Sequence, residues 1–155
     1  MKTPAIDTGA SMKILFDTSA LLKRYLPENG RQDLLALVAQ ASPAVAAPHC
    51  KVELYSALNR LRRETRPSEA FFRDTCDEVE RNFAEMDVVP LSSNVERAAI
   101  RALEASPMRG MDALHVGAAM AAGVDLFVTA DIRQFNGAQA FGLKATLLQN
   151  AKGAA

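Results

Sequence analysis

The chain contains no tryptophan, only two cysteines and two histidines, and no excess of either charge. The cysteines, Cys50 and Cys76, are too few for a disulfide scaffold and too far apart for a zinc-binding Cys-x-x-Cys pair. We expect both to be free thiols within helices. Eighteen Lys and Arg residues balance eighteen Asp and Glu residues, which excludes a strongly basic protein that holds nucleic acid by charge alone. An enzyme that acts on nucleic acid is not excluded, so the placement of the acids matters more than their number.

Long hydrophobic runs are also missing. No apolar stretch approaches the roughly 20 residues of a membrane-spanning helix, and the first residues lack the apolar segment of a secretory signal. We expect a cytoplasmic protein with no membrane contact. Residues 1–11 are predicted to form a flexible leader, with Met12 as an alternative start to Met1, and 150–155 a short tail. Residues 12–149 have the length of one domain.

Short apolar segments alternate with segments of helical periodicity along this domain. We predict strands over 13–16, 44–47, 88–89, 126–129 and 144–148. Helices are predicted over 19–25, from 31 to about 42, over 52–61, from a cap at Ser68 to about 86, over 93–105 and over 112–122. This alternation favours an α/β fold with a mostly parallel central sheet and helices on both faces, in three α/β/α layers. Functional groups in such sheets collect beyond the carboxyl ends of the strands.

Four of the acids stand apart from the rest, which lie at helical spacing from Lys or Arg and are expected on solvated faces. Asp17 follows the first strand and Asp131 follows the 126–129 strand, although each could instead cap the next helix. Asp112 opens an Ala-rich helix, where capping is again the alternative. Glu53 lies one turn into a helix between apolar neighbours, and could also be a lone surface acid.

Convergence of these four acids would create a site with a definite chemistry. Four carboxylates in one pocket repel each other and need a counter-charge. Oxygen-only ligands select hard cations such as Mg²⁺ or Mn²⁺, and such ions polarise phosphodiesters and activate water. No glycine-rich phosphate loop and no nucleophile paired with a histidine offers a competing mechanism.

Four segments, in this order, resemble the PIN-domain nucleases, and among them the VapC-type toxins of bacterial toxin–antitoxin systems. They are KILFDTSAL at 13–21, VELYSAL at 52–58, MDALH at 111–115 and LFVTAD at 126–131. The resemblance extends from about Met12 to Leu148, and the first and last segments are specific jointly rather than singly. It implies a PIN-like fold and an endoribonuclease that depends on Mg²⁺ or Mn²⁺. The implied partners are an RNA substrate, a cognate VapB-type antitoxin and a second copy of the chain in a homodimer.

The resemblance also assigns residues. The catalytic, metal-holding acids of the family carry over to Asp17, Glu53, Asp112 and Asp131, and the supporting hydroxyl positions to Ser19 and Thr129. Three basic residues beside these segments are candidates for contacting substrate phosphates: Arg109, Arg133 and Lys51.

The roles of the two histidines and one further function stay open at this stage. His115 could orient Asp112 or touch substrate, or could be a structural histidine bonded to the backbone, and His49 lies one turn before Glu53. The alternative function is a catalytically silent PIN-like module that binds RNA or protein. A phosphatase with an Asp-x-Asp motif is disfavoured because Ser19 occupies the second position.

Overall fold

Five parallel strands form the centre of the computed structural model, which describes residues 11–149. The predicted leader, except Ser11, and the predicted tail lie outside the described residues. The strands are β1 (Met12–Phe16), β2 (Ala41–Ala46), β3 (Asp87–Val88), β4 (Leu126–Thr129) and β5 (Ala145–Leu147). Their order in the sheet is β3-β2-β1-β4-β5, and every neighbouring pair is parallel. The predicted fold class is confirmed, with a sheet that is entirely parallel.

The direction in which the sheet grows changes between β1 and β4. From β1 the chain adds β2 and β3 on one side, and then returns to add β4 and β5 on the other. Phe16 at the end of β1 is therefore paired with Val128 near the end of β4. Such a point, where the loops after two adjacent strands diverge, is where ligands bind in open α/β sheets.

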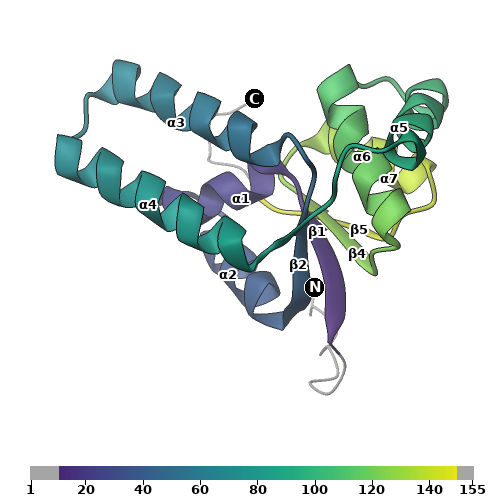
Figure 1. Cartoon of the computed structure of the whole chain (residues 1–155), viewed down its shortest axis with the longest axis horizontal. Coiled ribbons are helices and arrows are strands. Elements are labelled where there is room, and N and C mark those ends of the chain that lie inside the picture. Colours follow the sequence, from purple (N-terminus) through teal and green to yellow (C-terminus); the bar gives the residue numbers. More distant parts are fainter. Residues whose placement is uncertain (1–10, 150–155) are drawn as a thin grey trace.

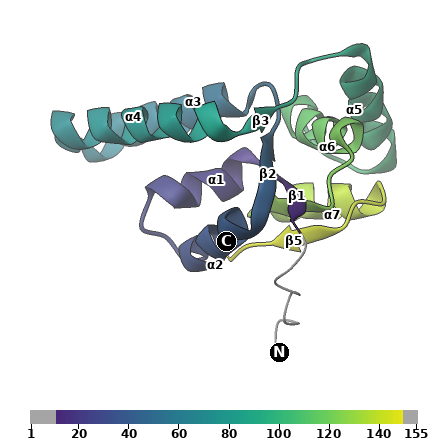
Figure 2. The same ribbon diagram turned by 60° about the horizontal axis from the view of Figure 1, so that its bottom comes forward.

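Seven helices of the described chain cover the two faces of the sheet, as Figures 1 and 2 show. Alternate strand residues point to opposite faces: Ile14 and Phe16 pack in one apolar core, and Leu15 packs in the other. The first core contains residues of α1 (Thr18–Tyr25), α2 (Arg31–Gln40), α3 (Cys50–Thr65) and α4 (Glu69–Glu85). The second contains residues of α5 (Ser93–Ala105), α6 (Gly110–Ala122) and α7 (Ile132–Ala140). In Figure 1, α3 and α4 lie side by side and extend away from the sheet.

Helix α7 and the start of β2 differ from the sequence prediction. No element is predicted between 130 and 143, although Asp131 is a possible cap there; Gly137 lowers the helix propensity of this segment. The side chain of Asp131 nevertheless caps α7 by accepting from the backbone N–H groups of Arg133 and Gln134. Strand β2 begins at Ala41 rather than 44, and its pairing with β1 is irregular around Pro43, a residue that argues against a strand in sequence alone.

Two smaller expectations concern the cysteines and the membrane. Cys50 is buried at the start of α3, Cys76 is half-buried in α4, and both are free thiols as predicted. Among residues 11–149, no helix combines the length and the apolar character that crossing a membrane requires.

The packing of α5 against α6 predicts the effect of one substitution. A Cβ atom at Gly117 would lie 2.6 Å from the backbone oxygen of Val95 and 2.8 Å from the backbone nitrogen of Ala99. Backbone atoms cannot turn aside as a flexible side chain can, so we expect Gly117→Ala to lower the free energy of unfolding by about 1–3 kcal/mol in urea denaturation. Gly110→Ala is the matched control, since nothing lies within 4 Å of a Cβ there. A Gly117→Ala protein as stable as the control would contradict this packing.

Candidate functional site

A pocket of about 440 Å³ opens beyond the carboxyl ends of β1 and β4. Residues from α1, α3, α6 and α7 and from the loops after the two strands line it. The structure brings all four of the acids singled out in the sequence into this pocket: Asp17, Glu53, Asp112 and Asp131. They come from four separate segments, so their meeting is a property of the sheet order rather than of any local motif.

Asp17 is the most deeply placed of these acids, with 2% of its surface exposed. Its Oδ1 accepts hydrogen bonds from the Ser19 hydroxyl at 2.7 Å and from the backbone N–H of Ala20 at 2.9 Å. Its Oδ2 accepts from the hydroxyl of Thr129. Burial raises the pKa of Asp17, and the charge of His115 and these hydrogen bonds lower it without cancelling the rise. Ionised Asp17 is therefore held in place but remains short of positive charge.

Ser19 and Thr129 connect the ends of the two central strands. Their hydroxyl oxygens lie 3.2 Å apart. Ser19 also accepts from the backbone N–H of Ala130, at 2.9 Å, and Thr129 from that of Asp131, at 3.0 Å. The two hydroxyls thus fix the carboxylate of Asp17 and the backbone that carries Asp131 relative to each other.

Glu53 is held through one of its two carboxylate oxygens. Its Oε1 accepts from the Thr18 hydroxyl and from His115 Nε2, each at 2.7 Å, and lies 3.3 Å from His49 Nε2. Burial disfavours the charged form, but the bond and charge of His115, with the bond from Thr18, outweigh it and hold the pKa of Glu53 below its usual value. Glu53 is therefore a carboxylate at neutral pH.

The other two acids lie at the N-terminal ends of helices: Asp131 is the cap of α7, as the capping alternative predicted, whereas the N-cap of α6 is Arg109 and Asp112 lies in the first turn. Asp112, in the first turn of α6, accepts from the backbone N–H of Arg109, and Asp131 caps α7 through its Oδ1. Burial raises the pKa of Asp112, the bond from Arg109 lowers it, and the charges of Asp131 and Glu53 raise it further. A place at a helix N-terminus and membership of the pocket are compatible for both residues.

The two histidines approach Glu53 rather than Asp112. Buried His115 contacts Glu53 and Thr18, and not the backbone group or the Asp112 carboxylate considered from sequence. His49 Nε2 lies 2.8 Å from the backbone oxygen of Met111. Burial and the neighbouring His115 lower the pKa of His49. The ring nitrogens and Glu53 lie close enough together to suggest a metal-binding group, but both Nε2 atoms face oxygen acceptors.

The charge of the pocket fits a hard divalent cation. None of the ion pairs among residues 11–149 joins a Lys or Arg to any of the four acids. Burial raises the pKa values of Asp17 and Asp112, and for Asp112 the nearby charges of Asp131 and Glu53 raise it further. The four acids line this pocket, and carboxylate oxygens are the donors that Mg²⁺ and Mn²⁺ prefer.

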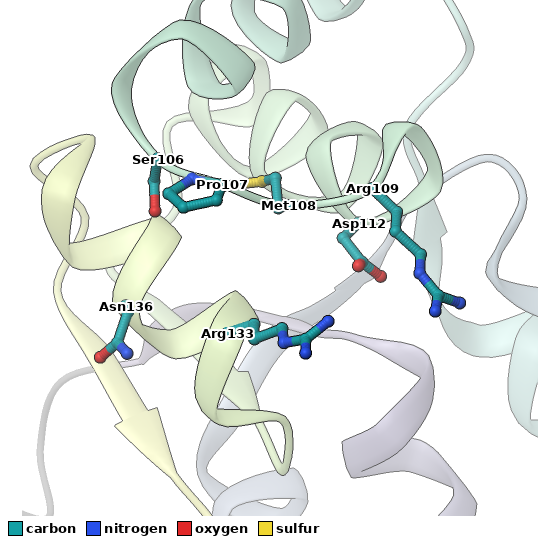
Figure 3. A pocket seen from close by; sticks show the side chains of 7 residues that line it. All are labelled: Ser106, Pro107, Met108, Arg109, Asp112, Arg133 and Asn136. Carbon is teal, nitrogen blue, oxygen red and sulfur yellow. The ribbon is translucent and has the colours of Figure 1, made fainter.

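The basic residues predicted to contact phosphate fall into two groups. Arg109 lines the acidic pocket, and Arg133 lines an adjoining one; in Figure 3 both side chains lie close to Asp112. Lys51 lies elsewhere: its ammonium pairs with Glu80 on α4, where both residues line a different pocket. The expected contact of Lys51 with the site is wrong in this structure. Lys51 and Glu53 are two residues apart, and on a helix this spacing directs their side chains to opposite sides.

Further residues line the pocket besides the candidates named from sequence. Arg60 is one of them, and its spacing of seven residues from Glu53 on one helix face is the signal that points to it. Thr18 and Gln134 also line it. Helical periodicity in the sequence does not mark either residue. Thr18 directly follows Asp17, and Gln134 lies three residues after Asp131.

Comparisons with known proteins identify the family. The PIN domain matches residues 14–139, and the chain belongs to the PIN-domain family. Among curated proteins, none matches it significantly in sequence.

Solved structures share the fold at low sequence identity. FitAcB from Neisseria gonorrhoeae has a TM-score of 0.65 at 11% identity, with 85% of this chain and 95% of that chain covered. VapC20 from Mycobacterium tuberculosis, a toxin that cleaves the sarcin–ricin loop, has a TM-score of 0.61 at 18% identity, with 84% of this chain and 96% of that chain covered. VapBC2 from Rickettsia felis, bound to a promoter DNA fragment, has a TM-score of 0.63 at 13% identity, with 87% of this chain and 98% of that chain covered.

The crowding of the acids predicts how one substitution changes stability. The pKa of Asp112 lies above its ordinary value of 3.8, so its contribution to stability falls as the pH rises through that raised pKa. Asp112→Asn removes the charge and keeps an oxygen that accepts from Arg109. In EDTA at about pH 7, we expect a higher Tm than the wild type, with a smaller gain at about pH 4. Exposed Asp74→Asn on α4 is the control; a lower Tm for Asp112→Asn alone would show that the acids do not repel each other.

Proposed function

We propose that the chain is a ribonuclease that hydrolyses RNA phosphodiester bonds with Mg²⁺ or Mn²⁺ at the four acids. The observation that carries this proposal is the meeting of Asp17, Glu53, Asp112 and Asp131 at the switch point of the sheet, without a Lys or Arg partner among the described residues. Membership of the PIN-domain family supports it. Four carboxylates in one pocket repel each other. A module that only binds RNA or protein has no need of this repulsion.

The protein's own contacts leave carboxylate oxygens available to a cation. The hydrogen bonds of Glu53 within the described chain all meet Oε1, and those of Asp131 meet Oδ1, so the second oxygen of each is available. Asp17 Oδ1 already accepts two hydrogen bonds, but Oδ2 accepts one within the described chain and keeps a second lone pair. A bound divalent cation supplies activation of water and stabilisation of the leaving oxygen at such a site.

Arginines around the acids suit an RNA substrate. Arg60 and Arg109 line the acidic pocket and Arg133 lines its neighbour, where guanidinium groups can bind backbone phosphates on either side of the acids. With 6% aromatic residues and no tryptophan, the chain has few side chains on which bases can stack, so we expect binding that depends mainly on phosphate contacts and weakens steeply with salt.

The structural relatives extend the proposal to partners. A complex from Klebsiella pneumoniae is a toxin–antitoxin complex, and the Rickettsia and Mycobacterium proteins are of the VapBC and VapC types. We propose that this chain is likewise a VapC-type toxin, inhibited by a cognate VapB-type antitoxin, that it forms a homodimer, and that it acts in the cytoplasm.

Cleavage of labelled RNA tests the activity. We expect the wild type to cleave with Mg²⁺ or Mn²⁺ and not with EDTA, and Asp17→Asn and Asp112→Asn to lose at least about 100-fold in rate, since even residues behind metal ligands cost 10–100-fold. Asp74→Asn should cleave like the wild type. Equal cleavage by the wild type and both site variants would point to a contaminating nuclease and sink the proposal.

Thermal unfolding tests the metal site without relying on activity. A cation that binds only the folded protein stabilises it by mass action, by about 2.7 kcal/mol at 100 times its Kd. We expect Mn²⁺ to raise the Tm of the wild type and of Asp74→Asn, and to have a much smaller effect on Asp17→Asn. A Tm shift without RNA cleavage would favour the silent module, whereas no shift at millimolar Mn²⁺ would argue against any metal at the four acids.

A further inference from the structure

A second pocket, of about 510 Å³, adjoins the acidic one. It lies between the segment that connects α5 to α6 and the outer side of α7 (Figure 3). Arg109 and Asp112 line both pockets, so the second pocket is open to a polymer that is bound at the acids. The remaining lining residues are Ser106, Pro107, Met108, Arg133 and Asn136.

The polar groups of this pocket are graded with distance from the acids. In Figure 3, the guanidinium groups of Arg109 and Arg133 lie on the side of Asp112, and the Ser106 hydroxyl and Asn136 amide lie on the far side. Two arginines against one aspartate give the lining a positive balance, which suits an anionic ligand. Beyond that charged end, the lining is neutral and able both to donate and to accept hydrogen bonds.

The wall between these two ends is apolar. Met108 packs on α7 at Gly137, where a Cβ atom would lie 2.1 Å from the Met108 Cε. The absence of a side chain at Gly137 therefore leaves room for the Met108 side chain beside the pocket. The backbone N–H of Arg133 bonds to Asp131 Oδ1 at 2.8 Å, which ties this wall to the acidic site.

A nucleotide has the same order of groups: a phosphate, then a base with flat apolar faces and a polar edge. The pocket volume lies within the range of about 300–1,000 Å³ that small-molecule sites occupy. A nucleotide with its phosphate at the charged end places its base at the neutral end. The graded lining therefore suits RNA.

We propose that this pocket binds the nucleotide next to the scissile phosphate of the RNA substrate, and that Asn136 selects its base. Arg133 and Arg109 bind the phosphate, the base lies against Met108 and Pro107, and the Asn136 amide bonds to the base edge. This inference rests on the proposed ribonuclease function and adds a place where the chain reads sequence.

Two measurements on one pair of variants test the subsite. Asn136→Ala removes the amide from an exposed position of α7, and Gln139→Ala removes an amide from another exposed position on the same helix, outside the pocket. The first measurement is cleavage of an RNA pool with randomised bases. We expect the wild type and Gln139→Ala to share a preference at one position beside the cut, and Asn136→Ala to reduce that preference about tenfold while still cleaving.

The second measurement is binding of short RNAs to Asp17→Asn protein by fluorescence anisotropy, which needs no cleavage. Adding Asn136→Ala or Arg133→Ala should weaken binding, and only Asn136→Ala should do so in a base-dependent way; Gln139→Ala should change nothing. If the wild type fails to cleave but these binding effects appear, the ribonuclease proposal fails and the subsite stands. Binding and preference unchanged by Asn136→Ala would overturn the subsite, and a loss only of antitoxin binding would assign the pocket to protein instead.

Discussion

A carboxylate buried at the centre of the sheet edge is the constraint on which the rest of the site depends. Asp17 is almost inaccessible to solvent, and its charge must be stabilised by the protein because unpaired buried charges are costly. Ser19, Ala20 and Thr129 supply hydrogen bonds from α1 and β4. The bonds that stabilise the charge are thus the bonds that hold α1 and β4 together at the end of β1, so the same contacts fix the fold and the site.

Helix N-termini explain how four acids share one pocket without a Lys or Arg partner among the described residues. Asp17 caps α1, Asp131 caps α7, and Asp112 and Glu53 lie in the first turns of α6 and α3. Each helix N-terminus carries a partial positive charge and unpaired N–H groups. A place at a helix N-terminus and a place in the pocket, which are alternatives in the sequence, are therefore one arrangement in the structure. With these four acids withdrawn from 18, the remaining 18 Lys and Arg face 14 acids, a mildly basic surface around an acidic pocket.

The sequence predicts those parts of the site that obey local rules. The strands were recognisable as short apolar runs, and the strand order brings the residues after β1 and β4 to one point, which made Asp17 and Asp131 predictable candidates. Helix α7 was not predictable in this way, because the capping bonds of Asp131 outweigh the low helix propensity of Gly137. Lys51 is close to Glu53 in sequence but not in space, because helix geometry turns its side chain toward Glu80.

The contacts of Glu53 lay beyond sequence reasoning for a different reason. Thr18 and His115 are 97 residues apart in the chain, and they meet only because α1 and α6 both begin near the carboxyl edge of the sheet. Nothing in either local segment encodes that meeting. Patterns of hydrophobicity set which face of a helix is buried, but which polar groups then come into contact is decided by how the helices pack across the sheet.

The hydrogen bonds of the two histidines bear on which cation suits the site. A backbone oxygen can only accept, so His49 Nε2, which faces the oxygen of Met111, carries a proton, and His115 Nε2 faces a carboxylate in the same way. A histidine that ligates a metal through Nε2 normally donates its Nδ1–H to an acceptor. Within residues 11–149, neither Nδ1 has a partner. Both rings are therefore better suited to donating to oxygen than to binding a metal, which supports carboxylates as the ligands of the proposed cation. An all-oxygen set favours Mg²⁺ or Mn²⁺ over zinc, which is the cation class that the proposed hydrolysis of RNA requires.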